Sequence, residues 1–220
     1  MSGFRQARDA MVEHQIAARG VKDESVLQAM RQVPRENFVA PGYEDAAYED
    51  RALPIDEGQT ISQPYVVALM IAAVELKPRD RVLEVGAGSG YAAAVMSRIA
   101  GAVYAIERRA SLAEAAAARL ARLDYGNIHI RTGDGTTGWS EEAPFDAILV
   151  SAGGPVVPQL LKDQLQISGR LVIPVGSGTG PQHLMKITRT TAETFEEKDL
   201  GKVMFVPLVG EGGWPDDSPR

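Results

Sequence analysis

The sequence predicts an α/β fold: a doubly wound, mostly parallel sheet with an N-terminal helical arm and a C-terminal antiparallel hairpin. Three observations lead to this prediction. From residue 61 onward, short and almost continuously apolar segments alternate with helical segments, which is typical of a parallel sheet covered on both faces. A glycine-rich turn joins the apolar segment 81–85 to the next helix. Residues 4–33 have helical periodicity instead.

The N-terminal region predicts two short helices. Gly20 ends the first, in which apolar residues recur at helical intervals: Phe4, Ala7, Met11 and Ala18. Asp23 can cap the second, Pro34 ends it, and one face of it carries Val26, Leu27, Met30 and Val33. Residues 34–60 are rich in turns and charges.

The remaining elements follow in order along the chain. The sequence predicts helices at 66–74, 91–100 and 111–123, and strands at 81–85, 102–106, 127–131, 145–150 and 170–175. Two further strand-like runs, 183–189 and 202–209, can close the sheet as a hairpin. Right-handed crossovers place the loops that follow the parallel strands along one edge, where such sheets bind ligands.

Composition excludes several classes of function. The formal net charge of -6 disfavours nucleic acid as a partner, and the lack of cysteine excludes disulfides, thiolate metal sites and cysteine nucleophiles. No metal is expected, because none of the histidines has metal-ligand spacing: His14, His129 and His183. No apolar run approaches the roughly 20 residues that span a bilayer, and the N-terminus lacks a secretory apolar region. We therefore expect a cytoplasmic protein with no membrane partner.

The glycine-rich turn is the first chemical signal. It follows Glu84 and contains Gly86, Gly88 and Gly90, which allow a ligand to approach the backbone closely. A dinucleotide site prefers G-x-G-x-x-G, but here Tyr91 stands at the last glycine position. G-x-G-x-G after a strand that carries Glu resembles the first motif of class I methyltransferases. An ordinary tight turn between strand and helix is the alternative.

Two acidic residues follow the next two predicted strands. Glu107 can accept hydrogen bonds from both hydroxyls of a ribose, and a solvated charge at a strand end is its alternative. Asp134, before Gly135, can accept from an adenine amino group, and a simple Asp-Gly turn is its alternative. All these features come at the carboxyl ends of successive strands, so we expect them to share one crevice.

A more specific block, ISQP, precedes the first helix of the sheet region. Ser62 can cap this helix, with Pro64 in its first turn. The same geometry also suits a binding site, because a helix N-terminus presents free N–H groups and partial positive charge to a carboxylate.

The chain resembles the protein-L-isoaspartate O-methyltransferase family over residues 8–210. The resemblance rests on the segments MVEHQIAARGV, VLQAMRQVPRENFV, EGQTISQPYVVALM, RVLEVGAGSGYAAAVM, GDG, PFDAILV and FVPLV. It implies a Rossmann-like methyltransferase fold, with Ser62 as the active-site residue. The cofactor-binding residues we expect are Glu84, Gly86, Gly88, Gly90, Glu107, Asp134 and Gly135. The substrate-binding residues we expect are Thr60, Ile61, Ser62, Val206, Pro207 and Leu208.

The resemblance also implies an activity. Such an enzyme transfers the methyl group of S-adenosyl-L-methionine to the free α-carboxylate of L-isoaspartyl residues in damaged proteins, leaving S-adenosyl-L-homocysteine and starting repair. We expect a monomer and one domain over residues 1–220. Residues 1–60 would be the arm and substrate-side loops, 61–210 the cofactor-binding core and 211–220 a flexible tail. Because a carboxylate is already ionised at neutral pH, Ser62 is expected to orient it rather than to act as a nucleophile.

Three alternatives remain at this point. The run after the fourth strand, residues 151–154, departs from the family pattern and keeps open a related methyltransferase with a different acceptor, such as a small molecule or a normal side chain. A nicotinamide-dependent oxidoreductase is disfavoured by the early third glycine. A non-catalytic module that binds the cofactor is the third.

Overall fold

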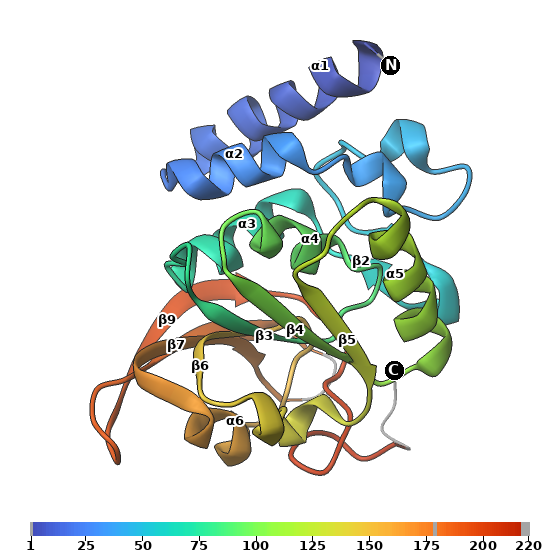
Figure 1. Cartoon of the computed structure of the whole chain (residues 1–220). Helices are drawn as coiled ribbons and strands as arrows, with labels where there is room; N and C mark the ends of the chain where they lie inside the picture. The colour runs from blue at the N-terminus through green and yellow to red at the C-terminus, as the bar shows by residue number, and fades with distance from the viewer. Residues whose placement is uncertain (1, 178–179, 217–220) are drawn as a thin grey trace.

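A seven-stranded mixed sheet forms the centre of the molecule (Figure 1). The computed structural model describes residues 2–177 and 180–216. The strand order is β5-β4-β3-β6-β7-β8-β9, parallel from β5 to β7 and antiparallel from β7 to β9. The strands are β3 (Arg81–Val85), β4 (Ala102–Glu107), β5 (Ile128–Thr132), β6 (Phe145–Val150), β7 (Leu165–Val175), β8 (Gln182–Arg189) and β9 (Phe195–Val203).

The central strands bury both of their faces, which explains their continuous apolar runs. Val82 and Val103 are partners in the β3–β4 register and belong to one apolar cluster, while Leu83 and Tyr104 belong to a second on the other face. The first cluster includes residues of α3 (Pro64–Ala73) and α4 (Tyr91–Ser97), and the second includes Leu161 of α6 (Gln159–Asp163). The predicted doubly wound sheet is confirmed.

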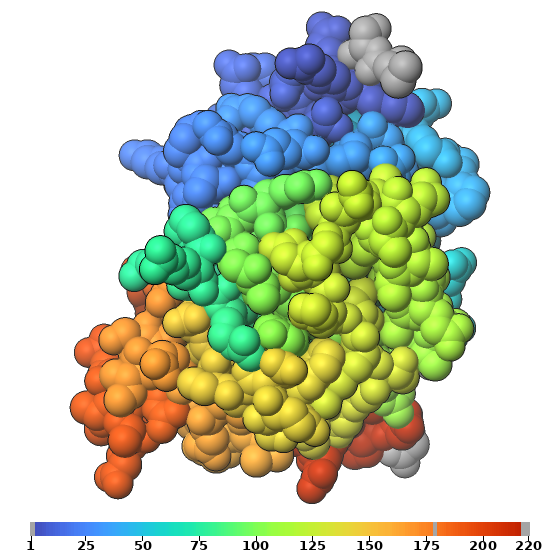
Figure 2. Space-filling view, in the orientation of Figure 1, coloured from blue at the N-terminus to red at the C-terminus, as the bar shows by residue number. Residues whose placement is uncertain are grey.

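The N-terminal arm packs on the first of these clusters, over α3 and α4 (Figure 1). In Figure 2 the arm lies in blue across one end of the molecule. Gly20 ends its first helical stretch in a left-handed conformation, with φ of 100°. Its elements are α1 (Ser2–Ala10), a π-helix η1 (Met11–Ile16), a 3₁₀-helix η2 (Ala17–Arg19) and α2 (Glu24–Gln32).

The predicted apolar stripe on the first arm helix is wrong in part. Ala7 and Ala18 are exposed, whereas Met11, Val12 and Ile16 are buried. The π-helical turns widen the helix over residues 11–16, so the buried face no longer follows a 3.6-residue period. The predicted cap of the second helix is confirmed, because the Asp23 carboxylate accepts hydrogen bonds from the backbone N–H groups of Ser25 and Val26.

The sequence places the last strand wrongly. The hairpin of β8 and β9 exists, but β9 is Phe195–Val203 rather than 202–209. Its sequence, FEEKDLGKV, is mostly charged and exposed. This is typical of an edge strand, and β9 is the last strand of the sheet. The more apolar residues 204–209 leave the sheet and pass beside the strand ends, where Pro207 forms an isolated bridge with Gly153.

Several short elements connect the main ones. The hairpin β1–β2 pairs Leu53 with Ile61 and so holds the chain just before Ser62. On the sheet edge, α5 (Ala110–Arg122) covers β4 and β5. The short elements are η3 (Arg35–Asn37), η4 (Glu44–Ala46), β1 (Leu53–Pro54), η5 (Asp56–Gly58), β2 (Thr60–Ile61), η6 (Gly135–Thr137) and η7 (Ser140–Glu142).

The C-terminal segment, expected to be flexible over 211–220, is held down in its first part. The backbone N–H of Glu211 donates to the Asp134 carboxylate at 2.7 Å. The indole N–H of Trp214 donates to the Gly153 carbonyl at 2.9 Å. Residues 217–220 lie outside the described part of the chain.

Candidate active site

A cavity of about 1080 Å³ opens at the carboxyl ends of β3, β4 and β6. Strand order reverses at this point, because β4 and β6 both flank β3, and open α/β sheets bind ligands at such reversals. The cavity also extends along residues 202–209 and along the start of α3. It therefore joins the two regions that the sequence assigns to cofactor and acceptor.

The glycine turn after β3 forms one wall of this cavity. Gly86 and Gly88 line it with φ of 87° and 52°, a conformation that glycine adopts without strain. Gly90 lies outside the cavity lining, and a Cβ there would stand 3.2 Å from Leu120 of α5. The third glycine therefore serves the packing of α4 against α5, and only the first two expose backbone to the cavity.

Glu107 is held at the end of β4 by hydrogen bonds to both of its carboxylate oxygens. Oε2 accepts from the Gly88 N–H at 2.8 Å, and Oε1 accepts from the Arg109 N–H at 3.0 Å. The residue is only 7% exposed and lines the cavity. Each ionised oxygen can accept one more hydrogen bond, so the side chain suits a pair of adjacent hydroxyl groups.

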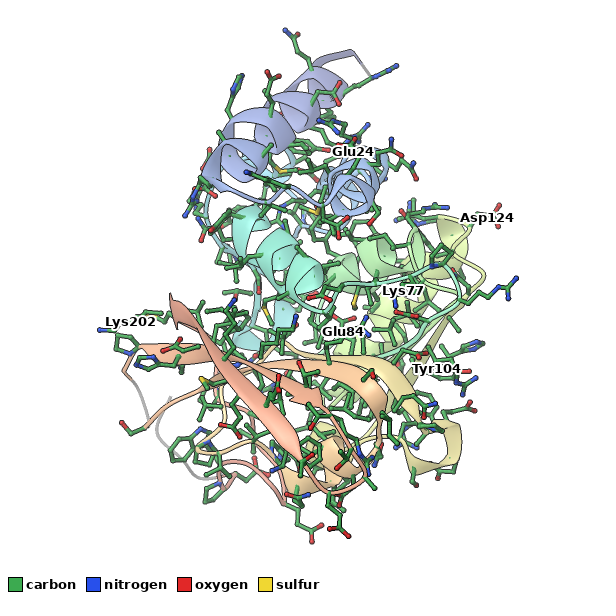
Figure 3. The ribbon with its side chains drawn as sticks, turned by 90° about the vertical axis from the view of Figure 1, so that its left-hand side faces the viewer. Glu24, Lys77, Glu84, Tyr104, Asp124 and Lys202 are labelled. Atoms are coloured by element: carbon green, nitrogen blue, oxygen red, sulfur yellow. The ribbon has the colours of Figure 1, made fainter. Side chains whose placement is uncertain are left out.

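Glu84 lies beneath the same turn, inside the molecule between the sheet and the helices above it (Figure 3). It is 1% exposed, belongs to the cavity wall, and its Oε2 has no hydrogen-bond partner within the described structure. Burial, and then repulsion from Glu107, raises the pKa of Glu84 well above its ordinary value, although the Ala93 N–H acts in the opposite direction. A cationic or hydrogen-bond-donating ligand group would satisfy this orphan oxygen.

Gly135 lines the cavity, but the carboxylate of its neighbour Asp134 does not. A Cβ at Gly135 would lie 2.3 Å from Val85 Cγ1, so only glycine fits between the loop and β3. Asp134 caps η6 by accepting from the Thr136 N–H at 2.8 Å, and it also accepts from Glu211. Burial raises the pKa of Asp134, but the hydrogen bonds from Glu211 and Thr136 outweigh it and bring the pKa below its ordinary value.

Ser62 faces the cavity and does not cap α3. Gln63 is the N-cap residue, without a side-chain cap hydrogen bond, and Pro64 occupies the first helical turn. The Ser62 hydroxyl is half-buried and makes no hydrogen bond to any described residue. Of the two roles that the sequence left open for Ser62, capping is therefore excluded, and the hydroxyl is free for a ligand near the first N–H groups of α3.

Residues 206–208 form another wall of the cavity, which we call the acceptor wall because the sequence assigns these residues to the substrate. The Val206 carbonyl accepts from the Gly153 N–H, and the Leu208 N–H donates to the Gly153 carbonyl, both at 2.8 Å. This pairing shows that the unusual run 151–154 is an ordered support of the wall. Of the residues that sequence analysis assigned to the site, the cavity is lined by Thr60, Ile61, Ser62, Glu84, Gly86, Gly88, Glu107, Gly135, Val206, Pro207 and Leu208.

Sequence analysis missed several residues of the cavity. Arg19, the last residue of η2, places its guanidinium carbon 3.5 Å from the centre of the Tyr65 ring and pairs with Asp50 at 2.8 Å. Gln182 and Lys202 also line the cavity, and Lys202 lies near the carboxyl end of β9 (Figure 3). No local pattern marks these residues, because each comes to the site from an element distant in sequence.

The described residues contain neither a metal-binding cluster nor a membrane-spanning helix. No group of three or more histidine, aspartate or glutamate side chains within residues 2–177 and 180–216 has the arrangement of a metal site. In the same ranges, every helix is too short or too polar to span a bilayer.

Comparison with known proteins gives consistent matches. A family model described as Protein-L-isoaspartate(D-aspartate) O-methyltransferase matches residues 6–213. A protein-L-isoaspartate O-methyltransferase of Brucella anthropi is 55% identical over 216 residues, covering 98% of this chain and 99% of the relative. Protein-L-isoaspartate O-methyltransferase 1 of Geotalea uraniireducens is 56% identical over 207 residues, covering 94% of each chain.

Solved structures agree with this result. A protein-L-isoaspartate O-methyltransferase superposes with a TM-score of 0.85 at 30% identity, over 95% of this chain and 67% of the other. A putative protein-L-isoaspartate O-methyltransferase of Plasmodium falciparum, in complex with S-adenosyl-L-homocysteine, superposes with a TM-score of 0.78 at 28% identity. That match covers 92% of this chain and 98% of the other.

Proposed function

Because this chain belongs to the protein-L-isoaspartate(D-aspartate) O-methyltransferase family, we propose that its cavity aligns a methyl donor at the strand ends with an isoaspartyl carboxylate beside Ser62. The enzyme methylates isoaspartyl residues of proteins, and this methylation serves protein repair. Bound S-adenosyl-L-methionine supplies the methyl group, as a cationic sulfonium, and leaves as S-adenosyl-L-homocysteine.

The residues at the strand ends fit the nucleoside and amino-acid parts of this donor. Glu107 keeps free acceptor positions on both oxygens, which suits the two ribose hydroxyls. Gly86 and Gly88 leave room for close approach to the backbone. The orphan oxygen of Glu84 suits a cationic ammonium group, which would also relieve the cost of its burial.

The start of α3 fits the acceptor. An isoaspartyl α-carboxylate has an ordinary pKa near 3.5 and is ionised at neutral pH, so no general base is required. Ser62 can donate one hydrogen bond to it, and the N-terminus of α3 adds partial positive charge. The chain's own contribution is alignment and exclusion of water, which can supply about 7–11 kcal/mol of the barrier lowering.

One observation carries this assignment. The free Ser62 hydroxyl and the hydrogen-bonded Glu107 carboxylate face the same continuous cavity. Ser62 is therefore an orienting donor, since no histidine lines the described cavity to activate it as a nucleophile.

Methyl transfer to a pair of synthetic peptides tests the proposal. The two peptides differ only in carrying L-isoaspartate or normal L-aspartate at one position. We expect base-labile methyl ester on the isoaspartyl peptide and little on the control. Equal methylation of both would favour the alternative acceptor, a normal side chain. S-adenosyl-L-homocysteine binding without transfer to either peptide would favour a non-catalytic module.

The remaining expectations are proposals with simple tests. We infer one domain, which is supported by the apolar cluster that arm and sheet share. A single unfolding transition seen by both tryptophan fluorescence and circular dichroism would agree with it. The monomeric state and the cytoplasmic location stay predictions, for analytical ultracentrifugation and cell fractionation to test.

A further inference from the structure

The chain reaches the acceptor wall, residues 206–208, shortly after β9, the last strand of the sheet. Val203, the last residue of β9, pairs with Gln182, the first residue of β8. Residues 204 and 205 have no strand partner in the described sheet, yet the chain continues in an ordered path to Val206. Something other than a β-ladder must therefore hold the chain between β9 and the wall.

The side chain of Gln182 provides that support. Its Oε1 accepts from the Phe205 N–H at 2.8 Å, and its Nε2 donates to the Phe205 carbonyl at 3.1 Å. The side-chain amide thus replaces the backbone of a partner strand, because it offers one donor and one acceptor to the same residue. Gln182 is 4% exposed, which makes both bonds costly to lose.

Two glycines enclose this amide. A Cβ at Gly153 would lie 3.0 Å from the Gln182 amide, and a Cβ at Gly176 would lie 3.0 Å from its Cα. The Gln182 side chain is therefore tightly packed between these two glycines, and a larger residue at either position would crowd it. Gly153 is also the residue whose backbone bonds Val206 and Leu208. The Gln182 amide, which binds Phe205, and the Gly153 backbone, which binds Val206 and Leu208, therefore lie next to each other.

We propose that Gln182 is a positioning residue for peptide binding, which acts through Phe205 to hold residues 206–208 against the isoaspartyl substrate. This role rests on the proposed function of that wall. It assigns Gln182 to the acceptor half of the cavity only, because the side chain makes no hydrogen bond to the glycine turn, Glu107 or Ser62. Loss of the clamp should therefore affect the peptide and spare the cofactor.

Gln182→Met tests this role, because methionine keeps the length of the side chain and removes both hydrogen bonds. We expect KM for the isoaspartyl peptide to rise about tenfold, equivalent to about 1.4 kcal/mol, and kcat to stay within about twofold. The dissociation constant of S-adenosyl-L-homocysteine should not change. Amide hydrogen exchange at Phe205 should accelerate. The matched control is Gln166→Met, at an exposed glutamine of β7 without a side-chain hydrogen bond.

Gln182→Glu adds a readout that a purely structural role would not move. A protonated carboxyl group can accept from the Phe205 N–H and donate to its carbonyl as the amide does, whereas a carboxylate can only accept. Burial raises the pKa of such a carboxyl. We therefore expect the ratio of the variant's KM to the wild-type KM at the same pH to fall toward one as the pH is lowered from about 8 to about 6.

The outcomes separate the two proposals. A wild-type enzyme that ignores the isoaspartyl peptide contradicts the proposed function, whatever Gln182 does. A wild-type enzyme that methylates the peptide, with Gln182→Met unchanged in KM, contradicts only the role of Gln182. If Gln182→Met weakened peptide binding and cofactor binding by the same factor and also lowered the midpoint of thermal unfolding, the role would be overturned as well. Such a result would show a general packing effect.

Discussion

Ser62 lies two residues before the first residue of α3, and Gln63 occupies the N-cap position between them. The hairpin of β1 and β2 holds Thr60 and Ile61, so Ser62 reaches the cavity before the helix begins. Pro64 has no N–H to satisfy, which lowers the need for a side-chain cap. A hydroxyl in this place is thereby available to a substrate.

The first prediction concerns this hydroxyl. Ser62→Ala should lower kcat/KM for an isoaspartyl peptide by about tenfold to a hundredfold, because a charge-assisted hydrogen bond contributes about 1.5–3 kcal/mol. Steady-state kinetics with the peptide measures the effect, and calorimetry with S-adenosyl-L-homocysteine should show unchanged affinity. Ser140→Ala, at an exposed serine away from the cavity, is the matched control. Unchanged turnover of Ser62→Ala would remove the assigned role.

The second prediction concerns the other half of the cavity. Glu107→Ala should weaken S-adenosyl-L-homocysteine binding by at least about tenfold, because it removes the expected ribose contacts and the acceptor that holds the Gly88 N–H. Isothermal calorimetry measures this affinity. Glu114→Ala, at an exposed glutamate of α5, controls for the loss of one negative charge. Equal affinity of Glu107→Ala and wild type would contradict the assignment.

At the scale of elements, close packing decides which glycines the site requires. Gly86 and Gly88 present backbone to the cavity, while Gly90 leaves room for α5. Gly135 lets the loop after β5 lie against β3, and this contact brings the two strand ends together. The turn after β3 therefore combines ligand contact with helix packing, and Gly135 in the loop after β5 adds the contact with β3.

A third prediction follows from the contact of Gly135 with β3. Gly135→Ala would bring Cβ to 2.3 Å from Val85 Cγ1, so we expect a loss of about 1–3 kcal/mol of stability. The midpoint of thermal unfolding should fall by several degrees, roughly 2–4 °C per kcal/mol at this chain length. Combining it with Val85→Ala should recover part of the loss, since the clash disappears. Gly126→Ala, with nothing within 4 Å of its added Cβ, should leave the midpoint nearly unchanged.

Strand β9 shows a limit of periodicity at the same scale. Its outer positions are charged because an edge strand covers no second layer, so its sequence lacks the apolar alternation that predicts strands. The apolar run 204–209 looks more like a strand, yet it borders the cavity and is held by Gln182, Gly153 and Trp214 instead of by a neighbouring strand. The apolar side chains there line the cavity and do not belong to a sheet.

Stability of the whole molecule should depend on the charge of Glu84. Burial, and then repulsion from Glu107, raises its pKa in the folded state, so the folded protein holds this proton more tightly than the unfolded chain does. The stability linked to this proton is complete below the unfolded pKa of about 4.3 and is lost as pH rises through the folded value. A raised pKa therefore makes the cofactor-free enzyme less stable toward neutral pH.

The fourth prediction tests this sign. Glu84→Gln cannot ionise, so its free energy of unfolding should gain on that of wild type as pH rises from about 5 to about 8. Urea unfolding of the cofactor-free proteins measures both values, with Glu114→Gln as an exposed control. A difference between wild type and Glu84→Gln that stays constant with pH would contradict the raised pKa.

By itself, the sequence determined the alternation of strands and helices, the glycine turn, and the chemical groups at the strand ends. These features are local: buried parallel strands need apolar runs, and a tight turn needs glycine wherever the chain lies. Only the tertiary structure decided that Asp134 faces the C-terminal segment, that Ser62 does not cap α3, and that the Gln182 side chain binds the backbone of Phe205. Those outcomes depend on contacts between residues far apart in the chain, and a local pattern carries no record of such partners.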